Sequence, residues 1–284
     1  MKILVTGVKG QLGYDMVRHL NARGIENRGV DIDDFDLTDG AAVLAYVREY
    51  RPTCIVHCAA YTAVDKAESE SEKCYAVNVT GTKNIAEAAK AVGAEMMYIS
   101  TDYVFDGFSK DTPWEVDDPK GPQSVYGKTK YEGELEVQKL LEKYYILRIC
   151  WVFGKNGNNF IKTMLRLSET RDEITVVADQ YGAPTYTYDA AALMCDIVES
   201  HKYGVYHASN EGDITWCDFA AEIFKQAGRD TKAVPVTTEE YQKLVPTAAP
   251  RPKNSRMSKK SLDDAGFKRL PGYKDALARY LKEL

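Results

Sequence analysis

The chain has 284 residues, 44% of them hydrophobic, which suits one large α/β unit with a smaller appended lobe. Its net charge of −5 comes from interspersed positive and negative residues, so there is no basic stripe and we expect no nucleic-acid partner. No apolar run approaches the roughly 20 residues that a membrane-spanning helix needs, and the chain starts directly with a strand-like segment. We therefore expect a cytoplasmic protein with no membrane contact.

The cysteines predict buried, reduced thiols rather than a disulfide framework, because they are scattered through mostly apolar segments. They are Cys54, Cys58, Cys74, Cys150, Cys195 and Cys217. Cys54 and Cys58 flank a strand-like segment, and a separation of four residues on a strand places their side chains too far apart to share one ion. The cysteines therefore predict no metal site.

Strand-like and helix-like segments alternate through the first half of the chain. Short β-branched or aliphatic runs predict strands at 2–6, 28–30, 53–57, 95–100 and 145–149. Apolar residues at three- and four-residue spacing predict helices at 11–23, 40–50, 74–92 and 125–143. This alternation is typical of βαβ units and predicts a Rossmann-type, doubly wound parallel sheet.

The pattern becomes less regular after Trp151. A loop is expected at 154–159, a helix at 160–167, a turn-rich stretch at 180–185, a strand at 204–208 and short helices at 259–265 and 274–281. We predict a dinucleotide-binding domain at 1–152 and a smaller, substrate-binding lobe at 153–284. The strand at 204–208 is expected to rejoin the main sheet.

The first strand runs directly into a glycine-rich turn with the spacing G-x-x-G-x-x-G. Gly7 permits the tight turn, Gly10 lets the backbone approach a phosphate, and Gly13 lets the following helix pack closely on the strand. Backbone N–H groups and the helix dipole favour an anion at this position. The turn predicts a site for a dinucleotide pyrophosphate.

Polar and small residues at the ends of the next two strands predict the rest of the cofactor site. Asp31 can accept hydrogen bonds from the adenosine ribose and repel a 2′-phosphate, which favours NADH over NADPH, although Arg28 could instead face a phosphate. Asp36 and Leu37 could flank the adenine or belong to the start of a helix. Ala59 and Ala60 leave room for a cofactor, but they also fit ordinary loop packing.

Tyr126 and Lys130 lie four residues apart near the start of a predicted helix, so both project from one face. A free tyrosine has a pKa of about 10, and an adjacent ammonium would lower it and make the phenol a better proton donor. Thr101 follows a predicted strand and could polarise a substrate carbonyl. The alternative for Tyr126 and Lys130 is a solvated helix face. The order of glycine turn, strand-end hydroxyl and Tyr/Lys pair favours an oxidoreductase.

These motifs resemble the extended short-chain dehydrogenases/reductases, and within them the dTDP-4-dehydrorhamnose reductases. The resemblance covers nearly the whole chain. Besides the glycine turn, its segments are AAYTAVDKAE at 59–68, STDYVF at 100–105, VYGKTK at 125–130, WVF at 151–153, GNNF at 157–160, DQYGAPT at 179–185 and RPKNSR at 251–256.

The resemblance implies reduction, by NADH or NADPH, of the C4 ketone of dTDP-4-dehydro-L-rhamnose to dTDP-L-rhamnose. It implies Thr101, Tyr126 and Lys130 as the catalytic set. It implies cofactor contacts at Gly10, Gln11, Leu12, Asp31, Asp36, Leu37, Ala59, Ala60 and Tyr61. It places Asp102 and Trp151 at the sugar, and Asn159, Gln180 and Arg251 along the nucleotide-sugar side. A guanidinium such as that of Arg251 can clamp a diphosphate, although Arg251 could also be a surface residue, and Trp151 a core aromatic.

Three further expectations concern alternatives. A nucleotide-sugar dehydratase or epimerase shares this fold, but a dehydratase needs an acid where this chain has Tyr103. Noncatalytic relatives that regulate methionine adenosyltransferase also share it, although they have no need of a Tyr/Lys pair.

Some relatives form a magnesium-bridged dimer; Asp15 could supply one ligand, but Tyr188 stands where another carboxylate is expected, so we predict no metal. The protein is expected to be a monomer or a homodimer.

Overall fold

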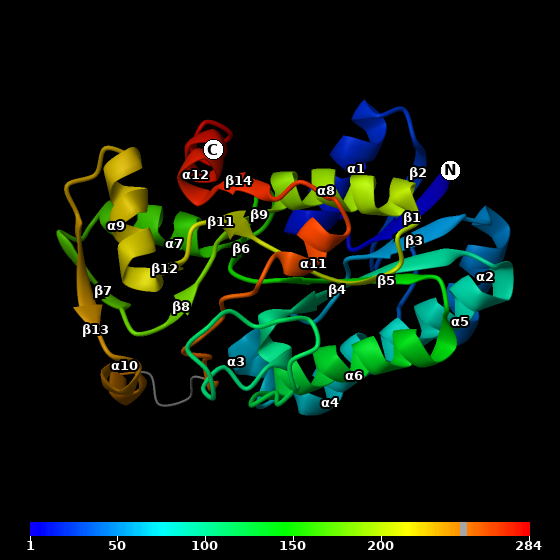
Figure 1. The fold of residues 1–284 in the computed structure, drawn as a ribbon, viewed down its shortest axis with the longest axis horizontal. Helices are drawn as coiled ribbons and strands as arrows, with labels where there is room; N and C mark the ends of the chain where they lie inside the picture. The colour runs from blue at the N-terminus through cyan, green and yellow to red at the C-terminus, as the bar shows by residue number, and fades with distance from the viewer. Residues whose placement is uncertain (245–248) are drawn as a thin grey trace.

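The computed structural model describes residues 1–244 and 249–284, which form an elongated molecule with two lobes (Figure 1). The larger lobe is built on a six-stranded sheet with the strand order β10-β5-β4-β3-β1-β2. Every neighbouring pair in this sheet is parallel. The strands are β1 (Lys2–Thr6), β2 (Glu26–Val30), β3 (Cys54–His57), β4 (Glu95–Thr101), β5 (Tyr144–Ile149) and β10 (Gly204–Ala208). The predicted doubly wound fold is confirmed.

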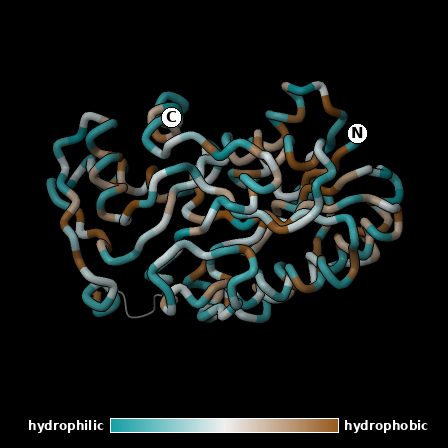
Figure 2. Tube along the Cα trace, viewed as in Figure 1, coloured by the Kyte–Doolittle hydropathy of each residue, from teal (hydrophilic) through white to brown (hydrophobic). Residues whose placement is uncertain are grey.

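Helices cover both faces of the sheet, because each presents an apolar stripe to strands that are buried on both sides. On one face lie α1 (Gln11–Ala22) and α8 (Thr187–Ser200), and on the other α2 (Gly40–Tyr50), α5 (Thr82–Val92) and α6 (Val125–Leu140) (Figure 1). Figure 2 shows hydrophobic residues concentrated along the strands and hydrophilic ones on the outer turns. The predicted helices at 11–23, 40–50 and 125–143 are confirmed, with ends shifted by up to three residues.

The helix predicted at 74–92 is interrupted in the structure. It consists of α4 (Ser71–Tyr75), a π-helical segment at Ala76–Gly81 and then α5, and the short helix α3 (Val64–Ala67) precedes it. Within the π segment, the side chain of Asn78 accepts from the Tyr61 backbone N–H and donates to the Tyr61 carbonyl. This local widening of the helix ties the loop after β3 to the helical layer.

The smaller lobe contains most of the elements that the sequence pattern did not reveal. The predicted helices at 160–167, 259–265 and 274–281 are confirmed as α7 (Phe160–Ser168), α11 (Lys260–Asp264) and α12 (Tyr273–Leu281). The other elements are β6 (Val152–Phe153), β7 (Glu173–Val177), β8 (Tyr181–Gly182), β9 (Thr185–Tyr186), β11 (Asn210–Glu211), β12 (Ile214–Thr215), α9 (Trp216–Gln226), β13 (Lys232–Val236), α10 (Thr238–Leu244) and β14 (Leu270–Gly272). Aromatic residues such as Phe153, Phe219 and Tyr280 form its core.

Several elements from the second half of the chain belong to the packing of the larger lobe. The strand β10 pairs with β5 at the edge of the sheet, and α8 contributes Met194 and Ile197 to the core under α1. Leu262 of α11 and Leu270 of β14 join the same core. The chain therefore returns to the larger lobe after entering the smaller one. The division at residue 152 stays a prediction. No helix in the described part of the chain is both long and apolar enough to cross a membrane.

A buried ion pair joins β5 to α6. The Arg148 guanidinium donates to both carboxylate oxygens of Glu134, at 2.9 and 2.7 Å, and both side chains are almost fully buried. Arg148 also donates to the Val116 carbonyl, which holds the loop before α6 in place. Removing one partner of such a pair leaves a charge buried without compensation.

We expect Glu134→Ala to lower the free energy of unfolding by about 3 to 5 kcal/mol, because Arg148 stays buried without its carboxylate. Gln138→Ala, an exposed position on the same helix, is the control and should change the value by less than about 0.5 kcal/mol. Urea denaturation followed by circular dichroism measures both. A Glu134→Ala protein as stable as the control would show that the pair is energetically neutral.

Candidate active site

The glycine turn after β1 has the close backbone contacts that its spacing predicts. Gly7 has φ +75° and donates its N–H to the Val30 carbonyl at 2.9 Å, while Gly10 donates to the Gly7 carbonyl at 3.0 Å. A Cβ atom on Gly13 would lie 2.3 Å from the Gly7 carbonyl oxygen, so only glycine allows α1 to start this close to the turn. No side chain caps the N-terminus of α1, which leaves its N–H groups for a ligand.

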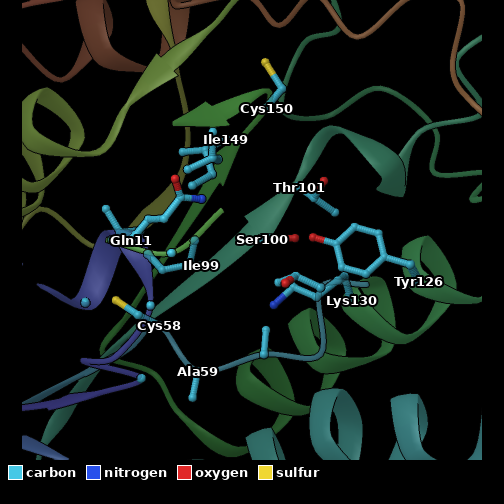
Figure 3. A pocket seen from close by; sticks show the side chains of 18 of the residues that line it. Gln11, Cys58, Ala59, Ile99, Ser100, Thr101, Tyr126, Lys130, Ile149 and Cys150 are labelled. Carbon is cyan, nitrogen blue, oxygen red and sulfur yellow. The ribbon is translucent and has the colours of Figure 1, made fainter. Parts of the chain in front are cut away.

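A hollow of about 630 Å³ opens at the carboxyl ends of β1, β3, β4 and β5 (Figure 3). Predicted residues that line it are Gly7, Gly10, Gln11, Leu12, Asp31, Ala59, Ala60, Thr101, Asp102, Tyr126, Lys130 and Trp151. A smaller hollow of about 190 Å³, lined by Phe35, Asp36 and Leu37, shares Asp31 and the two alanines with it. Tyr61 lines neither; its hydroxyl donates to Glu70 at 2.9 Å.

The charged residues near Asp31 differ from the expectation in one respect. The Asp31 carboxylate accepts from the backbone N–H groups of Lys9, at 2.8 Å, and Ile32, at 2.9 Å. Lys9, which the sequence reasoning missed, lines the large hollow and pairs with Asp33. Arg28 lines neither hollow, because its guanidinium lies 4.5 Å from the centre of the Tyr50 ring. Lys9 rather than Arg28 is the cation beside Asp31.

Asp36 lies beside the start of α2 without capping it. Its carboxylate accepts from the N–H and hydroxyl of Thr38, both at 2.8 Å, whereas Asp39 caps the helix by accepting from Ala41 and Ala42. The sequence left two interpretations of Asp36, a residue beside the adenine or part of the start of a helix. The structure supports the first, because Asp36 lines the smaller hollow and does not cap α2.

Tyr126 and Lys130 lie on the first turns of α6, facing the end of β4 (Figure 3). Ser124 caps this helix by accepting from the Gly127 N–H at 3.1 Å. A Cβ atom on Gly127 would lie 2.4 Å from the Tyr103 carbonyl oxygen, so glycine lets the helix start directly against the segment after β4. The solvated helix face is excluded for this pair, because Lys130 is only 3% exposed and its ammonium lies 4.1 Å from the centre of the Tyr98 ring.

Burial controls the ionisation of the two groups. It raises the pKa of the Tyr126 phenol above its ordinary value, although a hydrogen bond with Thr101 acts in the opposite direction. It lowers the pKa of Lys130 to about 7, which the charge of Glu134 partly offsets. In the chain by itself desolvation is the largest effect on the Tyr126 pKa, and the predicted lowering of this pKa by Lys130 together with an oxidised nicotinamide stays a prediction. Tyr126 holds its proton at neutral pH.

Thr101 and Asp102, at the end of β4, are linked to each other. The Thr101 hydroxyl donates to Oδ1 of Asp102 at 2.9 Å, and burial raises the pKa of this carboxyl to about 6. Two buried oxygens here, Oδ2 of Asp102 and Oγ of Ser100, have no hydrogen-bond partner among the residues that the structure describes. Ser100 also lines the hollow and was not predicted as a site residue.

A second hollow, of about 420 Å³, extends from Tyr103 and Trp151 into the smaller lobe. Trp151 lies against Trp216, with ring centres 3.6 Å apart and planes 14° from parallel. Its φ of +48° is unusual for a large side chain and is held in place by this packing. A Cβ atom on Gly182 would lie 2.5 Å from the Trp151 indole. Trp216 and Tyr241, which also line this hollow, carried no sequence signal.

Of the residues expected along the nucleotide-sugar side, Gln180 and Arg251 line this second hollow. Arg251 donates to Asp65 at 2.7 Å and to the Tyr103 hydroxyl at 3.2 Å. Gln180 donates to the Thr238 hydroxyl at 3.1 Å. Two polar side chains thus project here from segments far apart in the sequence.

Asn159 lines neither large hollow. It caps α7 by accepting from the Lys162 N–H at 3.0 Å. Its amide N–H groups donate to Gln11 at 3.0 Å, to the Gly154 carbonyl and to the Tyr280 hydroxyl. The structure therefore places Asn159 behind the site, where it positions Gln11.

The positions considered for a metal are occupied by other interactions. Asp15 is fully buried and accepts from Arg18 at 2.7 Å and from the Thr187 hydroxyl at 2.5 Å. The Tyr188 ring packs on His19, with centres 4.2 Å apart. Within residues 1–244 and 249–284, no three His, Cys, Asp or Glu side chains cluster as metal ligands. Five of the six cysteines are buried, as predicted, whereas Cys58 is only half-buried.

Comparison with known proteins gives consistent results. A family model described as the RmlD substrate binding domain matches residues 1–284. The dTDP-4-dehydrorhamnose reductase of Aggregatibacter actinomycetemcomitans is 42% identical, over 89% of each chain. The spore coat polysaccharide biosynthesis protein SpsK of Bacillus subtilis is 39% identical, over 99% of this chain and 97% of its own.

Solved structures agree with the sequence comparisons. A dTDP-4-dehydrorhamnose reductase of Clostridium acetobutylicum is 44% identical with a TM-score of 0.95, and the match covers 99% of each chain. The enzyme of the same name from Bacillus anthracis, in complex with NADP, is 41% identical with a TM-score of 0.95 and full coverage of both chains. At 21% identity and a TM-score of 0.84, a Thermus thermophilus UDP-glucose 4-epimerase shares the fold, over 100% of this chain and 98% of its own.

We expect Gly13→Ala to weaken binding of NADH and NADPH by about tenfold or more, because the added methyl group pushes α1 away from the turn that holds the pyrophosphate. Gly272→Ala is a matched control, since its Cβ would meet only one atom, at 4.0 Å. Fluorescence titration of the reduced cofactors gives both affinities. Equal affinities in the two variants would remove the glycine turn from the cofactor site.

Proposed function

Because the chain belongs to the RmlD substrate binding domain family of dTDP-4-dehydrorhamnose reductases, within the extended short-chain dehydrogenases/reductases, we propose that it reduces dTDP-4-dehydro-L-rhamnose to dTDP-L-rhamnose with NADH or NADPH. The observation that supports this most strongly is the convergence of Thr101, Tyr126 and Lys130 in the hollow that contains the glycine turn. The second hollow, lined by aromatic residues, shares Tyr103 and Trp151 with the first.

The residues of the larger lobe fit a nicotinamide dinucleotide. The open N-terminus of α1 and the glycine turn would hold the pyrophosphate, with Gln11 and Leu12 beside it. Asp31 would bind the adenosine ribose, and Asp36 and Leu37 would line the adenine pocket with Ala59 and Ala60. Tyr61 lines neither hollow, and its backbone N–H and carbonyl both bond to the Asn78 side chain, so its contact with the cofactor stays a prediction. The Asp31 carboxylate favours NADH, and Lys9 offers a counter-charge to the 2′-phosphate of NADPH.

When bound, the reduced nicotinamide supplies a hydride to C4 of the sugar. Tyr126 is held as a protonated phenol by burial and gives its proton to the oxygen that becomes the alcohol. Thr101 donates a hydrogen bond to the same oxygen and polarises the ketone. Lys130, with a pKa near 7, stabilises the phenolate left behind when it carries a proton.

The smaller lobe would hold the dTDP portion of the substrate. Its paired indoles, Trp151 and Trp216, offer a flat apolar surface against which a pyrimidine can stack. Arg251 can bind a diphosphate through the N–H groups that Asp65 and Tyr103 do not occupy. Asp102 faces the sugar, Gln180 lies deeper in the hollow, and Asn159 acts indirectly through Gln11.

Two alternatives have less support. Dehydration requires an acid where the chain has Tyr103, whose phenol bonds to Arg251. A noncatalytic regulatory role leaves the buried Tyr126 and Lys130 without a purpose.

We also propose a cytoplasmic location, because the reaction consumes a reduced nicotinamide cofactor and a nucleotide sugar. The chain would act as a monomer or a homodimer.

The direct test is to incubate the purified chain with dTDP-4-dehydro-L-rhamnose and either NADH or NADPH while following the absorbance of the reduced cofactor. We expect oxidation of the cofactor in step with formation of dTDP-L-rhamnose, identified by chromatography. UDP-galactose with NAD⁺ serves as a control for epimerase activity. Absence of cofactor oxidation with both NADH and NADPH would contradict the proposed function.

Tyr126→Phe should lower kcat by a factor on the order of 10² to 10⁴, because the phenyl ring fills the same space but has no proton to give. Cofactor affinity should stay within about twofold of the wild type. Tyr131→Phe, on the same helix, is the matched control and should retain full activity. An active Tyr126→Phe enzyme would remove Tyr126 from the role of proton donor.

A further inference from the structure

The Thr101 hydroxyl carries one proton, and it donates this proton to Oδ1 of Asp102 over 2.9 Å. Its oxygen accepts from the Tyr103 backbone N–H at 3.3 Å, and the Tyr126 phenol is a further hydrogen-bond partner of this hydroxyl. A hydroxyl in this arrangement has no proton left for a ketone oxygen in the hollow. Donation from Thr101 to the substrate therefore depends on the form in which Asp102 is present.

The surroundings of Asp102 favour its neutral carboxylic acid form. The residue is 3% exposed, and its Oδ2 has no hydrogen-bond partner within the described part of the chain. A buried carboxylate oxygen without a partner is costly, whereas the carbonyl oxygen of a neutral acid costs much less. Of the cations near this carboxyl, Arg251 bonds instead to Tyr103 and Asp65, and Lys130 lies over the Tyr98 ring.

The ionisable groups around Asp102 come from three neighbouring segments. They are the phenols of Tyr103, in the turn after β4, and Tyr126, on α6, and the thiol of Cys150, after β5; the charge of Asp102 raises the pKa of each. The hydroxyls of Ser255 and Thr101 and the backbone N–H groups of Asp102 and Tyr103 oppose the effect of burial, although none of them forms a hydrogen bond with Oδ2. Burial prevails and raises the pKa of Asp102 to about 6.

We propose that Asp102 is a positioning residue that acts through Thr101, and that turnover uses the enzyme form in which Asp102 is a neutral acid. This inference rests on the proposed ketone reduction. In the neutral form, the Asp102 O–H donates to the Thr101 oxygen, and the Thr101 proton is free to bind the ketone oxygen. In the ionised form, the carboxylate accepts the hydrogen bond from the Thr101 hydroxyl. The ketone oxygen then keeps the Tyr126 phenol as a donor and loses Thr101.

Asp102 keeps its proton throughout the reaction. The hydride still comes from the reduced nicotinamide and the transferred proton from Tyr126, so no further reactant is needed. The protonation state of Asp102 decides only which of Asp102 and Thr101 donates the hydrogen bond between them. A substituent that always donates to Thr101 should therefore reproduce the active form at every pH.

Asp102→Asn provides such a substituent, because the amide N–H can donate to Thr101 and does not ionise. The profile of kcat/KM against pH reports groups of the free enzyme. For the wild type, we expect kcat/KM to fall by up to about tenfold per pH unit above about pH 6, as the neutral form of Asp102 is lost. Asp102→Asn should lack this fall, so the ratio of its kcat/KM to that of the wild type should rise steadily as the pH rises above about 6. Tyr126 and Lys130 are present in both proteins, so the difference between the profiles isolates Asp102.

Parallel profiles for the two proteins, or an Asp102→Asn enzyme about a hundredfold less active at every pH, would overturn the inference. The second result would mean that the site needs the carboxylate itself, for example to accept from a sugar hydroxyl. Binding of the reduced cofactor to Asp102→Asn, measured by fluorescence, confirms that the variant is folded.

A second measurement tests whether Asp102 acts through Thr101. In a Thr101→Val background, the further change Asp102→Asn should alter kcat/KM by less than about twofold and leave the shape of its pH profile unchanged, because the hydroxyl that it orients is gone. Thr101→Ser, which keeps the hydroxyl, should retain the wild-type fall. An equal effect of Asp102→Asn with and without the hydroxyl would show an independent role and contradict the inference. If the wild type itself does not reduce the ketone, the proposed function fails together with the inference. If the wild type is active but the Asp102→Asn profiles or the Thr101→Val background give the contrary result, only the inference fails.

Discussion

Parallel pairing of β1, β3, β4 and β5 is the constraint on which the site depends. Because the strands run in one direction and in register, their carboxyl ends meet at one edge of the sheet. Gly7, Ala59 and Thr101 follow three of these strands and reach the same hollow from distant parts of the sequence. Close backbone contact at Gly13 and Gly127 then fixes the two helices whose first turns face this hollow. The ion pair between Arg148 and Glu134 holds one of these helices against the sheet, so the position of Tyr126 depends on the larger lobe as a whole.

Desolvation is the dominant electrostatic effect at the site. It moves Tyr126, Lys130 and Asp102 in the direction of their neutral forms, raising the pKa of the two acids and lowering that of the base. A site of this kind can offer neutral, protonated hydrogen-bond donors to a carbonyl group, and its own side chains carry little charge. Charge that develops during hydride transfer is therefore stabilised by hydrogen bonds in a region with little water. Ser100 and Asp102, whose Oγ and Oδ2 have no hydrogen-bond partner in the part of the chain that the structure describes, both line the large hollow.

The smaller lobe contributes recognition through shape as much as through charge. Trp151 stands between the two hollows in a left-handed conformation, stacked on Trp216 and in contact with Gly182. A larger residue in place of Gly182 would displace the indole, so a glycine far from the proposed chemistry shapes the substrate hollow. The pair of Arg251 and Asp65 joins the C-terminal segment to the loop after β3, and connects the two lobes next to the proposed diphosphate position.

The sequence by itself determined the doubly wound sheet, the glycine turn and the Tyr/Lys pair, because each depends on residues close together in the chain: alternation of short apolar runs, glycines three residues apart, and two side chains one helical turn apart. It did not reveal α8 or most of the smaller lobe, whose elements are short or buried on several sides and lack a clear period. Only the tertiary structure decided that Lys9 rather than Arg28 lies beside Asp31, that Asn159 caps a helix, and that Trp216 and Ser100 line the hollows. It also decided the burial that raises the Tyr126 pKa, since burial is a property of the packed molecule and is not encoded in the spacing of two residues.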